Sequence, residues 1–265
     1  MSVTDSAAAV AQPVLSTHGL TVRFGGHVAV NNVSCDFRPG TLTAIVGPNG
    51  AGKTTYFNLI SGQLPATAGT VKLRGQDITH LGAPKRTRMG MGRAFQLTNL
   101  FPNLSVLENV RLAVQSHRGL GINMTTLWFR HQDLIAKAEQ ILGLVALAER
   151  RDDLASALSH GDKRKLEVAI LLALEPDIFM FDEPTAGMSV DDVPVVLDLI
   201  RALKAQRNKT ILLVEHKMDV VRELADRIIV LHNGQLVADG EPEAVIASPV
   251  VQNAYLGVST EEEAA

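Results

Sequence analysis

The chain has 265 residues, and 25 Lys and Arg against 28 Asp and Glu give it a formal net charge of −3 at pH 7. Hydrophobic residues make up 46% and charged residues 20% of the chain, a globular composition that excludes disorder of the whole molecule. The charge balance gives no bulk electrostatic argument for binding nucleic acid or an anionic membrane. Cys35 is the only cysteine, so an internal disulfide framework and a Cys-based zinc site are excluded.

We expect neither a membrane span nor a signal peptide in the first residues of the sequence. The longest uncharged run there, 6–22, is interrupted by polar residues and by Pro13, and it lacks a positively charged leading region. We predict a disordered tail over 1–14 and a disordered acidic tail over 258–265. A role at a membrane is therefore expected to be peripheral and to need a partner.

The first third of the chain predicts strands around a glycine-rich loop. Alternating residues on both sides of the Gly25-Gly26 turn predict a β-hairpin over 15–37. An apolar strand over 41–46 leads into the glycine-rich run, after which Tyr56, Leu59 and Ile60 recur at helical spacing. A second hairpin is predicted over 69–75.

The rest of the chain predicts helices first and then an alternation of strands and helices. Residues 103–157 are mainly helical in pattern. Strands are predicted next at 178–181, 210–214 and 227–238, the last as a hairpin, and helices at 162–174, 193–206 and 218–225. Because strands alternate with helices, we expect an α/β fold with a mostly parallel, doubly wound sheet.

A phosphate-binding loop is the strongest motif in the sequence. The run Gly47-Pro48-Asn49-Gly50-Ala51-Gly52-Lys53-Thr54 matches G-x-x-x-x-G-K-[ST], with a strand before it and a helix after it. Backbone N–H groups and the helix N-terminus would bind an anion there. Lys53 is expected to contact the β and γ phosphates of ATP, Thr54 to ligate Mg²⁺, and Thr55 to belong to the same nucleotide site.

Two adjacent carboxylates end a predicted buried strand. Asp182 follows four apolar residues, and Glu183 comes directly after it. P-loop enzymes need a carboxylate in such a position to hold Mg²⁺ and its waters. Asp182 is therefore the predicted metal ligand, and Glu183 the predicted group that orients or deprotonates the attacking water.

Over about 15–257, the chain resembles the ATP-binding subunits of ABC transporters, because several short motifs occur in the order typical of that family. The resemblance implies a P-loop NTPase core with a mostly parallel sheet, an antiparallel β subdomain, and an α-helical subdomain inserted at about 97–175. It also implies three further roles. Phe24 would stack on adenine, Gln96 would reach Mg²⁺ and the attacking water, and His216 would be the switch histidine near the γ phosphate.

The segment Leu158-Ser159-His160-Gly161-Asp162 resembles the family signature. Ser159 is a good N-cap for a helix whose free N–H groups would face a phosphate. In the family this helix faces the γ phosphate in the opposite subunit, so Ser159 and Gly161 are predicted to act across a dimer. His160 and Asp162 depart from the usual glycine and glutamine, and the usual aspartate after the acidic pair is absent.

The signature and Ala186-Gly187-Met188 resemble a subgroup of importers for branched-chain amino acids, whose close relatives handle urea or amides. This implies an ATPase subunit at the cytoplasmic face of the inner membrane, as a homodimer or as a heterodimer with a homologous subunit. Two permease subunits and, indirectly, a periplasmic or extracellular substrate-binding protein are the implied partners. The alternative is a soluble ABC-type ATPase in translation or repair, although paired ATPase domains and long coiled coils are absent. A guanine-specific N-K-x-D reader is also absent, which speaks against a GTPase.

One uncharged segment is the predicted permease contact. The resemblance places the docking groove beside the segment that begins at Gln96, and residues 97–102 of that segment are largely apolar. An exposed apolar loop is unfavourable unless it meets a partner. Phe101 is therefore the predicted docking residue; the other possibility is that Leu100 and Phe101 pack under the helical subdomain.

Overall fold

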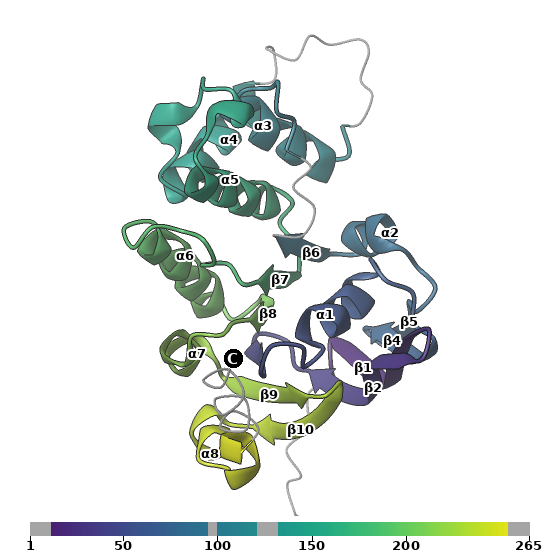
Figure 1. Ribbon diagram of the computed structural model, residues 1–265. Helices are drawn as coiled ribbons and strands as arrows, with labels where there is room; N and C mark the ends of the chain where they lie inside the picture. The colour runs from purple at the N-terminus through teal and green to yellow at the C-terminus, as the bar shows by residue number, and fades with distance from the viewer. Residues whose placement is uncertain (1–11, 95–99, 121–131, 254–265) are drawn as a thin grey trace, which may run out of the picture.

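The computed structural model describes residues 12–94, 100–120 and 132–253. Figure 1 shows a lower lobe built around two sheets and an upper lobe built from helices. Within the described ranges no helix is long and apolar enough to cross a membrane. Gln96, residues 97–99, residues 1–11 of the first predicted tail and the acidic tail lie outside these ranges. Residues 12–14 are described, and the predicted tail is too long at this end, because the N–H of Val14 donates to the carbonyl of Phe37.

A six-stranded sheet forms the centre of the lower lobe. Its order is β10-β9-β3-β8-β7-β6, and every pair is parallel except β10 with β9. The strands are β3 (Leu42–Val46), β6 (Met91–Ala94), β7 (Ile178–Asp182), β8 (Thr210–Val214), β9 (Arg227–His232) and β10 (Gln235–Gly240). All residues of β3, β7 and β8 are buried, as expected for parallel strands covered on both faces.

Helices and a second sheet cover the central sheet. The order β2-β1-β4-β5 describes an antiparallel sheet of β1 (Leu15–Phe24), β2 (His27–Phe37), β4 (Ala68–Leu73) and β5 (Gln76–Asp77). Helix α1 (Lys53–Ser61) packs its apolar residues with this sheet in one core cluster. The remaining helices of this lobe are α2 (Ala83–Arg88), α6 (Val193–Ala205), α7 (Met218–Leu224) and α8 (Pro242–Ile246).

The upper lobe lies between β6 and β7 in the chain (Figure 1). Its helices are α3 (Val106–His117), α4 (Gln132–Leu144) and α5 (His160–Ala173), with short 3₁₀ turns at Ala148–Arg150 and Ala155–Ala157. They bury one apolar face each and join the core cluster that also contains β7 and β8. The segment 121–131 lies outside the described residues.

The observed elements agree closely with the sequence prediction of the fold class. The prediction of a P-loop core with a mostly parallel sheet, an antiparallel sheet and inserted helices is confirmed. Helix α5 begins at His160, directly after the predicted N-cap Ser159 and two residues before the predicted helix start at 162. The short elements α2, β6 and α8 were not predicted, since each is too brief to show a periodic pattern.

Helix α2 is held by one buried arginine. Arg86 is 2% exposed and donates hydrogen bonds to backbone carbonyls near the end of α1 (Leu59 and Ile60) and in the loop between β5 and α2 (Thr79 and Leu81). A cation at a helix C-terminus satisfies carbonyls that lack partners within the helix. This contact fixes the far end of the helix whose first turn carries the P-loop lysine.

Candidate functional site

The glycine-rich loop connects β3 to α1 at the carboxyl end of the parallel strands. The φ values of Gly47, Gly50 and Gly52 are 150°, 76° and 93°, which residues other than glycine rarely adopt. A Cβ on Gly47 would lie 2.1 Å from the carbonyl oxygen of Leu231, and one on Gly52 would lie 2.5 Å from that of Ala29. These glycines allow the loop to wind tightly against β2 and β9.

Lys53 is folded back into the loop. Its side-chain nitrogen Nζ donates to the carbonyl oxygens of Gly47, at 2.7 Å, and Pro48, at 2.9 Å. Burial lowers the pKa of Lys53, while the negative charges of Glu183 and Asp182 counteract part of this shift. The ammonium group thus lies within the field of both predicted catalytic carboxylates, at the centre of the loop.

A cavity of about 280 Å³ opens in front of the loop. The structure brings together at this cavity most of the predicted phosphate-binding residues, both predicted catalytic side chains that it describes, and two residues of β2. The lining residues are His27, Ala29, Asn49, Gly50, Ala51, Gly52, Lys53, Thr54, Thr55, Glu183 and His216. The cavity is bounded by the glycine-rich loop, the first residues of α1 and the ammonium group of Lys53, a setting that is suitable for an anion.

Glu183 and His216 face each other across the cavity mouth. Nε2 of His216 lies 2.7 Å from Oε1 of Glu183, a hydrogen bond that the carboxylate accepts. Both side chains are partly exposed, at 39% for His216 and 38% for Glu183. Glu183 also has φ 51°, a left-handed conformation that is unusual for glutamate and that occurs at functional sites. This geometry leaves both groups accessible to a water molecule.

Asp182 lies behind this pair and is almost fully buried. Its oxygen Oδ2 accepts a hydrogen bond of 2.8 Å from Arg93, and both side chains are 6% exposed. Burial raises the pKa of Asp182, and the charge and hydrogen bond of Arg93 counteract part of this rise. Oδ1 of Asp182 has no hydrogen-bond partner in the part of the chain that the structure describes. An orphaned, buried carboxylate oxygen next to a P-loop fits the role of a magnesium ligand.

The sequence reasoning missed a third acidic residue. Glu215 is 3% exposed, and it connects two catalytic loops. Its Oε1 accepts from Oγ1 of Thr185 at 2.7 Å, and its Oε2 accepts from the backbone N–H of His216 at 2.7 Å. Glu215 thus ties the loop after Glu183 to the loop that carries His216. Its position directly after the apolar strand β8, like that of Glu183 directly after β7, was the available signal.

The signature residues lie elsewhere in the same chain. Ser159 is the N-cap of α5: its Oγ accepts from the N–H of Asp162 at 3.1 Å and donates to that carboxylate at 2.9 Å. Lys165 pairs with Asp162 at 3.0 Å and with Asp192 at 2.5 Å, which links α5 to the segment before α6. Neither Ser159 nor Gly161 lines the P-loop cavity.

Phe24 and Gln96 are the remaining predicted site residues. Phe24 is 51% exposed and is paired in the β1–β2 hairpin with His27, which lines the cavity. It therefore borders the P-loop cavity without lining it. Gln96 lies outside the described residues, three positions after Arg93.

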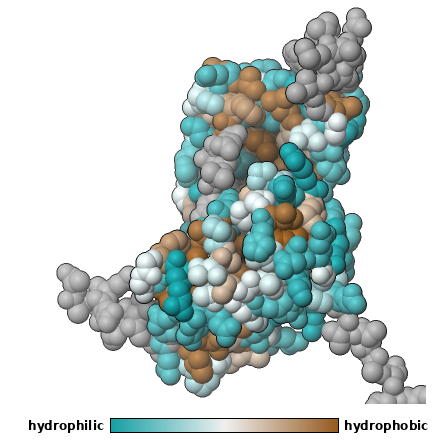
Figure 2. All heavy atoms as spheres, turned by 90° about the vertical axis from the view of Figure 1, so that its right-hand side faces the viewer, coloured by the Kyte–Doolittle hydropathy of each residue, from teal (hydrophilic) through white to brown (hydrophobic). Residues whose placement is uncertain are grey.

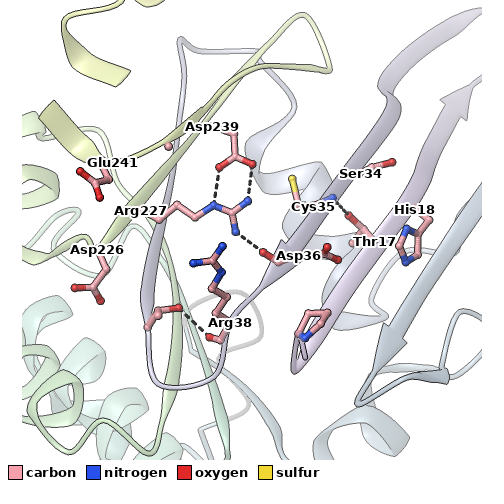
Figure 3. Close-up of a pocket in the computed structure, with 13 residues that line it drawn as sticks. Thr17, His18, Ser34, Cys35, Asp36, Arg38, Asp226, Arg227, Asp239 and Glu241 are labelled. Carbon is pink, nitrogen blue, oxygen red and sulfur yellow. Dashed lines mark hydrogen bonds and ion pairs between the residues drawn. The ribbon is translucent and has the colours of Figure 1, made fainter. Parts of the chain in front are cut away.

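A larger cavity, of about 750 Å³, lies at the opposite end of the parallel strands. Figure 3 shows Arg227 at its centre, with its guanidinium donating to both oxygens of Asp239 and to the backbone of Asp36. Asp226, which also lines it, pairs with Lys204 and accepts from the N–H of Leu42. Arg227, Asp239 and Asp226 therefore already have partners within the chain.

Comparisons with known proteins agree with this site. The profile of the ABC transporter family matches residues 30–186. The "High-affinity branched-chain amino acid transport ATP-binding protein LivG" of Escherichia coli (strain K12) is 40% identical over 94% of this chain and 99% of its own length. The solved "ADP conformation of MJ1267, an ATP-binding cassette of an ABC transporter" is 30% identical, with a TM-score of 0.76 over 92% of this chain and 98% of that one. A "dimeric structure of a post-hydrolysis state of the ATP-binding cassette MJ0796 bound to ADP and Pi" is 25% identical, with a TM-score of 0.74 over 86% and 98%.

The fold and the P-loop site define a nucleotide-hydrolysing enzyme of the P-loop class. The chain belongs to the ABC transporter family and is an ATP-binding cassette with ATPase activity. The family, the fold class and the activity that the sequence predicted are thereby confirmed.

Proposed function

We propose that this chain is the ATP-hydrolysing subunit of an importer for branched-chain amino acids. The observation that carries the substrate class is the similarity to LivG over nearly the full length of both chains. The chemistry is supported by the cavity, which joins the P-loop, Glu183 and His216. Transport itself would occur in separate membrane subunits, while this chain supplies the energy.

ATP would bind with its phosphates in the loop cavity. Lys53 would exchange its two backbone carbonyl acceptors for the β and γ phosphates, a change that needs only rotation of a flexible side chain. Phe24 is placed to offer an exposed aromatic face to the adenine. Mg²⁺ would be held by Thr54, Asp182 and Gln96, and it would neutralise phosphate charge during the reaction.

Glu183 would accept a proton from the attacking water. The carboxylate needs a fixed orientation for this task, and the hydrogen bond from His216 provides one. His216 in turn is held through its backbone by Glu215, which also holds Thr185. The loop that carries Glu183 and Thr185 and the loop that carries His216 would therefore respond together to the γ phosphate.

The working unit would be a dimer, either of two copies or of this chain with a homologue. Ser159 and Gly161 lie apart from the P-loop cavity of their own chain, and the N-terminus of α5 carries free N–H groups suited to a phosphate. Two chains arranged head to tail would place this helix against the γ phosphate of the other chain. ATP would close the dimer, and hydrolysis would let it open.

The permease would dock against the helical lobe. Phe101 is 53% exposed, so it does not pack beneath that lobe, whereas Leu100 does pack against the core. Leu154, which forms an isolated antiparallel bridge with Ser105, is 50% exposed. Figure 2 shows apolar side chains at the surface of the helical lobe. Two permease subunits would hold the ATPase dimer peripherally at the cytoplasmic face of the inner membrane, and a periplasmic or extracellular binding protein would deliver the substrate.

Uptake of radiolabelled leucine in a strain that lacks this gene tests the proposal. We expect uptake to be lost, to return with the wild-type gene, and not to return with Glu183→Gln. The wild-type protein should also sediment with membranes, and this association should disappear when the permease genes are deleted. Unchanged leucine uptake in the deletion strain, or recovery of the protein with ribosomes or DNA, would favour a soluble ATPase of translation or repair instead.

A further inference from the structure

Arg93 occupies an unusual place beside the proposed metal site. It is the only charged residue of β6, and its side chain is 6% exposed. One terminal nitrogen of its guanidinium donates to Asp182. The other donates to three side-chain oxygens at the end of α1 and just after it, namely those of Asn58 (2.6 Å), Ser61 (2.8 Å) and Gln63 (3.0 Å).

This arrangement needs an arginine. The two terminal nitrogens point in different directions, so one planar group joins the carboxyl end of β7 to the far end of the P-loop helix. The guanidinium also lies 4.9 Å from the ring centre of the buried Phe57, a contact that favours a delocalised cation. A lysine has a single point charge and could not bridge both elements in this way.

The contact decides which oxygen of Asp182 is available. Oδ2 is occupied by Arg93, whereas Oδ1 has no hydrogen-bond partner among the described residues. We propose that Arg93 is a positioning residue that presents Oδ1 of Asp182 to the magnesium ion bound with ATP, and that it holds α1 at a fixed distance from β7. The ion's proposed ligands Thr54 and Asp182 sit on these two elements, so their spacing depends on Arg93.

This inference rests on the proposed nucleotide function of the site, and it adds a residue that is not in the phosphate-binding motif. Side chains that orient a metal ligand usually change metal affinity by about 10–100-fold when they are removed. They leave the metal-free binding of the other ligand intact. That separation distinguishes a positioning role from a purely structural one, which would lower stability without a selective effect on the metal.

The test uses Mn²⁺ as the metal probe, read by electron paramagnetic resonance in the presence of ATP, with the full-length chain. We expect Arg93→Met to raise the dissociation constant of Mn²⁺ by about 10–100-fold, and Arg93→Lys to have an intermediate effect. Binding of a fluorescent ATP analogue in EDTA should be unchanged in both variants. Arg88→Met, at an exposed arginine of α2, is the matched control and should behave as the wild type.

A folded Arg93→Met variant that binds Mn²⁺ as tightly as the wild type would overturn the proposed positioning role of Arg93, but it would leave the proposed ATPase function intact. If Arg93→Met does not fold, Arg93→Lys decides, and wild-type Mn²⁺ affinity in that variant would overturn it equally. A loss of ATP-analogue binding in EDTA that matches the loss of Mn²⁺ would also contradict a positioning role. A wild-type chain that binds no ATP in either condition would instead overturn the proposed function, and this inference with it.

Discussion

The carboxyl edge of the six-stranded sheet and the first turn of α5 are both built to meet a phosphate, but they are built differently. The sheet edge gathers a cation, two carboxylates and a histidine from loops that are far apart in sequence. The first turn of α5 offers a capping serine, a glycine and backbone N–H groups, and its carboxylate, Asp162, is paired with Arg150 and Lys165. One region therefore has the groups for chemistry, while the other has groups suited to recognition. Since the second region does not line the cavity of its own chain, each would be half of a site.

Among the substitutions that test this comparison, the replacement of Glu183 should have the largest effect on ATP turnover. Glu183→Gln keeps the hydrogen bond to His216 possible but removes the base, so ATP turnover should fall by about 10²–10⁴-fold. ATP binding should persist, and size-exclusion chromatography with Mg-ATP should show a dimer that the wild type does not accumulate. Turnover near the wild-type level would mean that another group activates the water.

Lys53→Ala should act on binding rather than on chemistry. Loss of one partner of a buried, hydrogen-bonded charge pair costs about 2–5 kcal/mol, so ATP affinity should fall by about 30-fold or more. Equilibrium binding of a fluorescent ATP analogue measures this change. Lys85→Ala, at an exposed lysine of α2, is the control. Retained affinity in a folded Lys53→Ala variant would contradict the assignment of the loop.

Ser159→Ala tests the role of the first turn of α5 in recognising the phosphate. A hydrogen bond to a charged group contributes about 1.5–3 kcal/mol, so turnover should fall by about ten- to hundredfold. ATP binding to the isolated monomer should not change, because Ser159 does not line the cavity. Ser105→Ala is the matched control, since Ser105 caps α3 in the same way and loses the same helix-capping energy. Equal effects of the two variants on turnover would mean that Ser159 only caps its helix and does not contact the phosphate.

Phe101→Ala should have the smallest effect on the isolated protein. Phe101 is 53% exposed, so its truncation should change neither the melting temperature nor the basal ATPase rate appreciably. Co-purification with the permease should weaken, and leucine uptake should become uncoupled from ATP hydrolysis. Leu144→Ala, at the exposed end of α4, is the control for apolar surface in the same lobe. Destabilisation by several kcal/mol would show that Phe101 is a core residue.

The two regions also differ in how far the sequence predicts them. The P-loop, the acidic pair and the N-cap of α5 are local patterns, in which neighbouring residues define both the backbone shape and the chemistry. The contact of Arg93 with Asp182 spans 89 positions, and that of Thr185 with Glu215 spans 30. Such contacts depend on which strands become neighbours in the sheet, and the order β3-β8-β7-β6 cannot be read from one sequence. Short β6 carried no periodic signal, so its arginine could not be placed.

Some predictions extend past the described residues. Gln96, residues 97–99, residues 1–11 and the acidic tail lie outside them, so the roles given to them stay predictions. The boundaries of the helical subdomain at about 97 and 175 have the same status. Phe24 is exposed next to His27, which fits the predicted platform for adenine.

The central claim is that two chains complete each ATP site, and mixing two inactive variants tests it most directly. Lys53→Ala disables the sheet edge, and Ser159→Arg disables the first turn of α5. In an equimolar mixture about half of the dimers are mixed pairs, each with one intact site, so the account predicts turnover of about a quarter of the wild-type value. Turnover of the mixture that equals the average of the two separate variants would contradict it, because each site would then be complete within a single chain.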